Sequence, residues 1–380
     1  MNAPNHPSSQ LTSERTERDT SGSKPAKKVV QVMIVDDSLT VRTIFSRMIE
    51  GDPLLSLATT ASNAERAIAI LRKMPVDVVL LDLEMPGMGG LEALPRILET
   101  AKGAQVLVVS SLTEDGAEHT VAALSMGAAD TMPKPRPGGF NDKYRASLLA
   151  KIHALGGIER PECSPAPALR QDGQTAAPAK SKTHGKQPEV VAIGASTGGI
   201  HALNIILRDL PQGFDLPILI TQHLPPTFIP VFARQVEVAA ARRTVVAESG
   251  TAIRRGEIAI ATGHGHMIVE RRNGGLITNT CTKPARSGCL PSVDPMLDSL
   301  AKAVDGHALA VILSGMGRDG AEGAAQLVEK GGTVLAQDAE SSAVWGMPGA
   351  VAKAGLASAI LPPEELVREI AATAGAAAWK

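Results

Sequence analysis

The feature that most constrains the fold is a repeated alternation of short apolar runs with segments of helical periodicity. From residue 29 the apolar runs read VVQVMIV, LLSLAT, VDVVLL, AQVLVVS and AADTM. Segments with helical spacing lie between them, such as Thr40–Glu50, Asn63–Lys73 and Gly116–Met126. Five buried strands that alternate with helices over about 125 residues predict a parallel, doubly wound α/β sheet.

The alternation stops and then starts again. The stretch 156–188 is rich in Pro, Ala, Lys and Gln and has no periodicity, which is typical of a linker. New apolar runs follow it, namely VVAIG, PILITQ, EIAIAT, MIVERR, ALAVILS and TVLAQ. We therefore expect a polar, disordered extension at 1–28 and two α/β domains, at 29–155 and 189–380, each able to bury its own core. The second domain is expected to be doubly wound and mostly parallel.

Charge and composition narrow the classes of function. The 38 basic and 39 acidic residues give a net charge near −1, which argues against a broad footprint for DNA or anionic lipid. Scarce aromatic residues argue against stacked recognition of single-stranded nucleic acid. The N-terminus lacks an apolar signal segment, no run approaches about 18 apolar residues, and three cysteines suit a reducing compartment. We expect a cytoplasmic protein with no nucleic-acid partner and no membrane insertion.

The strand ends of the first domain share a common chemistry. Asp36 and Asp37 follow the first strand, Asp82 ends the third, Ser110 ends the fourth and Lys134 follows the fifth. Ligands of parallel sheets bind outside the carboxyl ends of the strands, so these side chains are expected to converge. Three carboxylates need a cation, and Mg²⁺ suits an all-oxygen site. One carboxylate would then accept a phosphoryl group, whereas the plainer interpretation is a set of helix caps.

These residues lie in the motifs VDDS, LLDLEMPGMGG, VVSS and MPKP, and residues 29–150 resemble the receiver domain of bacterial response regulators. The resemblance implies a flavodoxin-like five-stranded fold and a sensor histidine kinase as phosphodonor. It also implies roles for particular residues: Asp82 as phospho-acceptor, Asp36, Asp37 and Asp82 as Mg²⁺ ligands, and Ser110 with Lys134 as the switch pair. The chain departs from the pattern at Thr131, where many receivers carry an aromatic residue.

In the second domain three turns follow strands. The segment VVAIGASTGGIHAL places Ser196 in a turn that leads into a helix, whose positive end lies nearby. This turn would cradle a phosphate, present Ser196 as a nucleophile, or merely cap the helix. His223 follows the strand in PILITQHLPPTF, and Asp319 follows the strand in ALAVILSGMGRDGAEGAAQL. At one sheet edge, His223 would activate Ser196 and Asp319 would orient the imidazole.

The third turn also supports a rival interpretation. Gly315, Gly317 and Gly320 form a GxGxxG pattern between strand and helix, with Asp338 about 20 residues on, as in dinucleotide-binding domains. Such a fingerprint usually opens its domain, whereas this one lies near the end of the chain. Dinucleotide binding would also leave Ser196 and His223 without a role.

A metal site is a second alternative. His264, His266, Cys281 and Cys289 are zinc-ligand types that lie close together in the sequence. They lack the paired CxxC spacing that makes such a pattern specific. A loop at the rim of the active site is the plainer interpretation.

The motifs GASTGG, QHLPPTF, PSVDPML, GMGRDGAEG and AQDAESSAVWGMPGAV lie within residues 189–360. They resemble the catalytic domain of chemotaxis protein-glutamate methylesterases, the CheB family, whose members also carry a receiver domain. The resemblance implies Ser196 as nucleophile, His223 as general base, Asp319 as its orienting carboxylate, the Met316 N–H as an oxyanion donor, and Thr197 and His266 as site-lining residues. Leu290 is a departure, since the family usually carries a basic residue there.

The resemblance implies hydrolysis of γ-glutamyl methyl esters on chemoreceptor helices, together with deamidation of glutamines, in sensory adaptation. The esterase reaction would need no cofactor, and Mg²⁺ would serve phosphorylation of the receiver. We expect the unphosphorylated receiver to cover the catalytic crevice and phosphorylation of Asp82 to shift it away. A non-enzymatic phosphate sink or receptor adaptor is the alternative.

Overall fold

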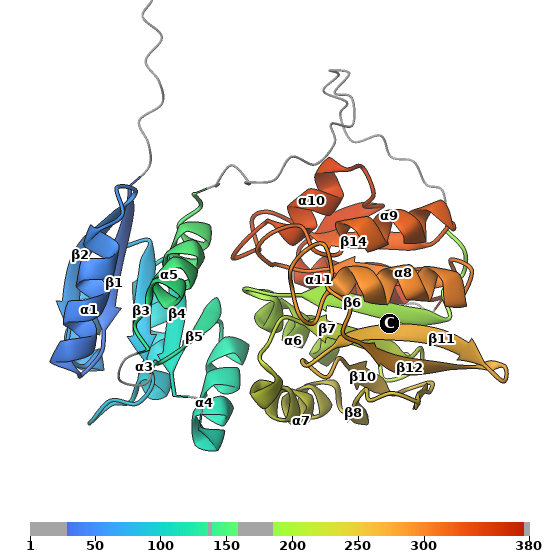
Figure 1. Cartoon of the computed structure of the whole chain (residues 1–380), viewed down its shortest axis with the longest axis horizontal. Helices are drawn as coiled ribbons and strands as arrows, with labels where there is room; N and C mark the ends of the chain where they lie inside the picture. Colours follow the sequence, from blue (N-terminus) through green and yellow to red (C-terminus); the bar gives the residue numbers. More distant parts are fainter. Residues whose placement is uncertain (1–28, 112, 136–138, 159–184, 376–380) are drawn as a thin grey trace, which may run out of the picture.

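The computed structural model describes residues 29–111, 113–135, 139–158 and 185–375. These residues form a first unit (29–158) and a second unit (185–375), which lie side by side in Figure 1. The predicted disordered extension at 1–28 and most of the predicted linker at 156–188 fall outside the described residues.

The first unit is a parallel five-stranded sheet in the order β2-β1-β3-β4-β5. This is the flavodoxin-like order, so the predicted fold class is confirmed for this unit. The strands are β1 (Val30–Val35), β2 (Leu55–Ala61), β3 (Val78–Asp82), β4 (Gln105–Ser110) and β5 (Asp130–Pro133). The helices are α1 (Leu39–Glu50), α2 (Ala64–Leu71), α3 (Gly90–Thr100), α4 (Glu114–Ser125) and α5 (Asp142–Leu155).

Short polar residues fix where these helices begin. The Ser38 side chain accepts a hydrogen bond from the Val41 N–H and so caps α1, and Asn63 caps α2 through the Arg66 N–H. Ser38 is the last residue of the VDDS motif. The motif therefore ends β1 and starts α1, which leaves its two aspartates at the carboxyl edge of the sheet.

The second unit contains a parallel seven-stranded sheet in the order β15-β14-β13-β6-β7-β10-β8 and an antiparallel sheet in the order β11-β12-β9. The fold is thus mostly parallel α/β, as predicted, and the MIVERR run lies in the antiparallel sheet. The strands are β6 (Val190–Ala195), β7 (Ile218–Gln222), β8 (Thr244–Val246), β9 (Thr251–Ile253), β10 (Ile258–Ile260), β11 (His266–Arg272), β12 (Gly275–Cys281), β13 (Ala308–Ile312), β14 (Thr333–Gln337) and β15 (Ala359–Leu361). The helices are α6 (Gly199–Asp209), η1 (Pro226–Phe228), α7 (Ile229–Ala240), α8 (Val293–Ala303), α9 (Ala321–Glu329), α10 (Met347–Lys353) and α11 (Pro363–Thr373).

The central strand β6 shows why this sheet is covered on both faces. All six of its residues are buried. Val191 and Ile193 pack into one hydrophobic cluster, whereas Val190 and Ala192 pack into another on the opposite face. A Cβ on Gly194 would lie 2.6 Å from a methyl group of Val293, so glycine allows α8 to approach the strand closely.

In each sheet the strand order reverses direction at one switch point, where the chain stops adding strands at one edge and begins to add them at the opposite edge. In the first unit this switch point lies between β1 and β3, and in the second it lies between β6 and β13. Crevices at the carboxyl ends of the strands form at such points, which makes them the expected binding positions of open α/β sheets. No helix in the described part of the chain combines the length and apolar character that crossing a membrane requires.

Candidate active site

The acidic residues of the first unit meet at its switch point. Asp36 and Asp82 are each at most 2% exposed, whereas Asp37 is exposed. Lys134 Nζ lies 2.7 Å from Asp82 Oδ2 and 3.1 Å from Asp36 Oδ2. Ligand atoms of the three carboxylates lie within 4.8 Å of one another.

The chemistry of this cluster fits a hard divalent cation. Asp36 Oδ2 is buried, and Lys134, which it shares with Asp82, is its ion-pair partner. Burial is the main cause that raises the pKa of Asp82 to about 6, against the opposing effect of Lys134. Burial likewise raises the pKa of Asp36. One lysine thus leaves the two buried carboxyl groups incompletely neutralised, and the cluster is consistent with a Mg²⁺ site.

The predicted switch residue Ser110 does not bond to Asp82. Its hydroxyl lies 2.5 Å from Thr120 Oγ1 on α4, and Thr120 in turn donates to the Gly116 carbonyl at 2.6 Å. Thr131 is buried on β5, and its hydroxyl has no hydrogen-bond partner among the described residues. The end of β4 is therefore tied to α4 through a pair of hydroxyl groups.

The switch point of the second unit brings together the turn after β6 and the loops after β7 and β13. Ala195 pairs with Gln222 in the parallel ladder, so Ser196 and His223 are the next residues on neighbouring strands. The Ser196 N–H donates to the Ser314 carbonyl at 3.0 Å. A Cβ on Gly315 would lie 2.8 Å from the Ser196 Cβ, so a glycine is needed where the two loops touch.

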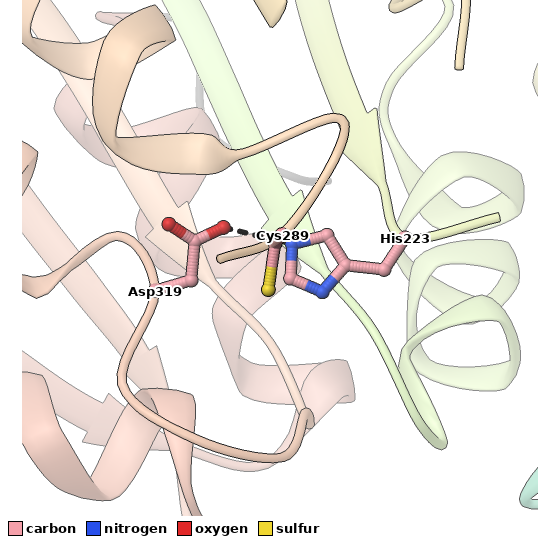
Figure 2. Close-up of side chains that lie close together, drawn as sticks. All are labelled: His223, Cys289 and Asp319. Atoms are coloured by element: carbon pink, nitrogen blue, oxygen red, sulfur yellow. Dashed lines mark hydrogen bonds and ion pairs between the residues drawn. The ribbon is translucent and has the colours of Figure 1, made fainter. Parts of the chain in front are cut away.

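His223 and Asp319 form the central contact of this site. His223 Nε2 lies 2.8 Å from Asp319 Oδ2, as the dashed line in Figure 2 shows. Since an ionised carboxylate only accepts hydrogen bonds, Nε2 carries the proton and the Nδ1 lone pair is left for a substrate-side partner. Ser196 Oγ makes no hydrogen bond within the described part of the chain. The structure thus joins the predicted His–Asp pair and places Ser196 beside it through the backbone.

Asp319 is held by donors that the sequence analysis did not assign. Ser292 Oγ donates to Asp319 Oδ1 at 2.6 Å, and the Val293 N–H donates to Oδ2 at 2.7 Å. Both donors lie at the N-terminus of α8, whose dipole also favours an anion. In the sequence, the signal for this role is the Ser–Val–Asp run of the PSVD motif, which starts a helix.

Hydrogen bonds shift the pKa values of this pair in opposite directions. Burial alone would raise the pKa of Asp319, but hydrogen bonds from His223, Ser292 and Val293 outweigh burial and hold it well below its usual range. Burial would lower the pKa of His223, but the hydrogen bonds with Asp319 and Cys289 raise it to about 9. The arrangement therefore keeps Asp319 ionised and makes His223 a stronger base than a free imidazole.

The remaining predicted residues, Thr197, Met316 and His266, differ in their hydrogen bonding and exposure. The backbone N–H groups of Thr197 and Met316 donate no hydrogen bond within the described residues, and Met316 is 42% exposed. His266 is buried, with Nδ1 2.9 Å from the Ser292 N–H and Nε2 2.8 Å from the Lys283 carbonyl. It therefore holds the segment that carries Ser292.

The zinc-ligand types noted near residue 264 do not converge on one point. Within the described residues, the groups of three or more ligand-type side chains close enough for a metal are Asp36–Asp37–Asp82 and His223–Cys289–Asp319. Cys289 thus lies beside the base instead of joining His264, His266 and Cys281.

The turn after Ser196 also contacts the first unit. Thr197 Oγ1 donates to Asp130 Oδ2 at 2.5 Å, and the Gly198 N–H donates to the Ala129 carbonyl at 2.5 Å. Lys151 Nζ lies 2.5 Å from the same Asp130 oxygen. The start of β5 therefore sits directly on the residues that follow Ser196.

Comparison with known proteins gives a consistent family for both units. The CheB methylesterase family model matches residues 191–370, and the response regulator receiver domain model matches residues 32–139. The chain is 40% identical over 366 residues to protein-glutamate methylesterase/protein-glutamine glutaminase 1 of Paramagnetospirillum magneticum, covering 90% of this chain and 95% of that protein. It is 39% identical over 357 residues to protein-glutamate methylesterase/protein-glutamine glutaminase of Azospirillum brasilense, covering 89% of this chain and 91% of that protein. A second such enzyme of Caulobacter vibrioides is 41% identical over 348 residues, covering 91% and 99%.

These matches join the two units in one protein and run through the turns that carry Ser196, His223 and Asp319. The dinucleotide-binding interpretation of Gly315–Gly320 is therefore set aside. The chain belongs to the CheB methylesterase family, in its form with an N-terminal response regulator receiver domain.

Proposed function

We propose that this chain demethylates glutamate methyl esters, and deamidates glutamines, on the cytoplasmic helices of chemoreceptors, under control of its receiver unit. The observation that carries the proposal is the 2.8 Å contact between His223 and Asp319 at the sheet edge where Ser196 emerges. Family membership supports the substrate class, and the geometry supports a serine hydrolase mechanism.

The proposed reaction begins with attack of Ser196 Oγ on the ester carbonyl carbon. His223 Nδ1 takes the hydroxyl proton, while Asp319 stabilises the imidazolium through Nε2. The N–H groups of Thr197 and Met316 would donate to the oxyanion. The imidazolium then protonates the ester oxygen, or the amide nitrogen in deamidation, as its bond to the carbonyl carbon breaks, and methanol or ammonia leaves. A water molecule, deprotonated by the same imidazole, hydrolyses the acyl-serine and releases glutamate.

In the first unit, we assign Asp82 as the phospho-acceptor for a sensor histidine kinase. Asp36, Asp37 and Asp82 would hold Mg²⁺, whose chemistry there is to neutralise charge on the phosphoryl oxygens. Lys134 already lies 2.7 Å from Asp82 and would bond a phosphoryl oxygen after transfer. Ser110 would turn from Thr120 toward the phosphoryl group and thereby complete the switch pair.

Three observations support control by occlusion. The start of β5 covers the turn after Ser196 through Asp130 and Thr197. Helix α4 packs against α6, α7 and η1, on the side of the first unit that faces the second in Figure 1. The interface of α4 includes a hydrogen bond between Ser125 and Gln235. It is not closely packed, because a groove of about 820 Å³ remains between α4, α6 and α7. Loss of the Ser110–Thr120 bond would shift α4 and loosen this interface.

The experiment that tests the activity is methanol release from methylated receptors, with and without a small phosphodonor and Mg²⁺. The parent chain should release methanol faster with phosphodonor, whereas Ser196→Ala should lose several orders of magnitude in rate. Asp82→Asn should keep the basal rate without the stimulation. Near-parental activity of Ser196→Ala would reject the mechanism.

Occlusion has its own test in the full chain. Asp130→Ala removes the acceptor for Thr197 and should raise basal methanol release without phosphodonor. Asp142→Ala is the matched control, because Asp142 is an exposed carboxylate of the same unit at the start of α5. Equal basal rates in the two variants would argue against a cover held by Asp130.

A further inference from the structure

Cys289 is a nucleophilic side chain at the proposed active site that the esterase mechanism does not use. It is a free cysteine, partly exposed, on the loop between β12 and α8. Figure 2 shows its sulfur beside the imidazole of His223 and near Asp319. One ligand atom from each of these three residues lies within 4.8 Å of the others.

The three ligand atoms make a set suited to zinc. A thiolate, an imidazole nitrogen and a carboxylate oxygen are the ligand types that Zn²⁺ prefers, and three protein ligands leave its fourth position open. The ligand atoms of a tetrahedral zinc lie roughly 3.3–3.8 Å apart. The 2.8 Å contact between His223 and Asp319 would therefore open by about half an ångström, and the sulfur already lies within 4.8 Å of both ligand atoms.

Charge and access also favour this ion. One thiolate and one carboxylate together neutralise a divalent cation, and His223 binds as the neutral imidazole. His223 has 15% of its side chain exposed and Cys289 is partly exposed, so an ion can reach both. Cys289 already interacts with His223, and its thiol makes only a long contact of 3.9 Å with the Ser287 carbonyl.

We propose that His223, Cys289 and Asp319 bind Zn²⁺ reversibly and that the bound ion switches the esterase off. Inhibition follows because the metal takes the place of the proton on Nε2, the neutral imidazole then carries its proton on Nδ1, and Nδ1 has no lone pair left to take the Ser196 proton. This consequence rests on the proposed function, whereas the metal site itself does not. Mg²⁺ would not substitute, since a hard ion favours the all-oxygen cluster at Asp82.

The test uses the full chain and two readouts. Co²⁺ serves as a spectroscopic probe for Zn²⁺, because a thiolate ligand gives a charge-transfer band in the near ultraviolet. Methanol release from methylated receptor is measured in parallel across a Zn²⁺ titration, with recovery by EDTA. We expect the parent chain to show the band and to lose activity reversibly with Zn²⁺, and Mg²⁺ at the same concentrations to leave it active.

The variants separate this site from other thiols. Cys289→Ser should lose the Co²⁺ band, and half-inhibition of its own metal-free rate of methanol release should need at least about tenfold more Zn²⁺ than half-inhibition of the parent chain. The double variant Cys163→Ser with Cys281→Ser retains Cys289 and should behave like the parent chain. Cys289→Ala, checked by its melting temperature, provides a second substitution if the serine variant folds poorly.

Each outcome decides the proposal. Inhibition of Cys289→Ser at the parental Zn²⁺ concentration, or a parent chain without the Co²⁺ band, would overturn the site. A parent chain that shows the band but releases no methanol would keep the zinc site and reject the proposed function. Active enzyme with no response to Zn²⁺ would keep the function and reject the switch.

Discussion

Asp82 and Asp319 occupy equivalent positions in two parallel sheets, yet their environments are opposite. Each lies at a switch point, at the carboxyl edge, and each is 1% exposed. Asp82 accepts hydrogen bonds from Lys134 and the Glu84 N–H and lies close to Asp36. Asp319 accepts from a histidine, a hydroxyl and two backbone N–H groups.

The pKa values follow this difference. Burial raises the pKa of Asp82 to about 6, whereas donors hold that of Asp319 far below its usual range in spite of similar burial. Burial alone therefore does not decide the state of a carboxyl group; the number of donors aimed at it does. Asp319 is therefore held as an anion against His223, whereas Asp82 is only partly neutralised by Lys134.

The largest expected effect is on catalysis by Asp319→Asn. The substitution removes the acceptor that fixes the His223 tautomer, so we expect methanol release to fall by roughly 10³–10⁴-fold. Asp298→Asn is the matched control, since Asp298 is a carboxylate on the same helix α8 that forms its ion pair with Lys302 instead of with His223 or Asp319. A comparable loss in both variants would mean that charge near the site matters more than the bond to His223.

The pH dependence of the parent chain should show the raised pKa of His223. The base must be neutral to accept a proton, and its pKa is raised to about 9, so kcat/KM should rise about tenfold per pH unit up to about pH 9. Methanol release is measured from pH 6 to 10 at constant ionic strength, with the Ser196→Ala rate subtracted for ester breakdown. An acidic limb centred at 6.5 would show that Asp319 does not strengthen the base.

Stability should respond to Asp82→Asn in the opposite sense from Asp319→Asn. The folded-state pKa of Asp82 lies above its ordinary value of 3.8, so its charge destabilises the fold at high pH. We expect Asp82→Asn to stabilise the first unit by about 1–3 kcal/mol at pH 8 without Mg²⁺, and the gain to vanish as pH falls through about 6 toward 4.

The pKa of Asp319 is lowered in the folded chain, so its ionised carboxylate stabilises the fold above about pH 4, and this contribution is lost as the pH falls and the group is protonated. Asp319→Asn should therefore destabilise the second unit at neutral pH. Calorimetric unfolding of both variants at pH 8 checks the two signs. Asp37→Asn, an exposed carboxylate of the same cluster as Asp82, should change little. If both Asp82→Asn and Asp319→Asn changed the free energy of unfolding in the same direction, the proposed contrast between the two carboxyl groups would be wrong.

The smallest effect is expected from loss of one donor to Asp319. Ser292→Ala removes the 2.6 Å hydrogen bond but leaves His223 and Val293 in place, so we expect methanol release to fall roughly tenfold. Ser287→Ala is the control, because its hydroxyl reaches Ser292 but not Asp319. Parental kinetics of Ser292→Ala would show that the backbone donors suffice.

The sequence by itself determined the fold class of both units and which residues end the strands. Alternating apolar and helical segments specify parallel sheets, and parallel strands bring their carboxyl ends to one edge. Asp36, Asp82, Ser196, His223 and Asp319 could therefore be grouped from short motifs without coordinates.

Only the tertiary structure decided which loops from other parts of the chain close over those edges. Ser292 contacts Asp319 and Cys289 lies beside His223, both from the segment before α8, and Asp130 reaches Thr197 from 67 residues away. Loop paths and the packing of one unit on another depend on side-chain contacts over the whole molecule, and no local periodicity records them. The residues at the strand ends can thus be predicted from the sequence. Their chemical environment, which includes the donors to Asp319, the Cys289 thiol and the contact of Asp130 with Thr197, is a property of the folded chain.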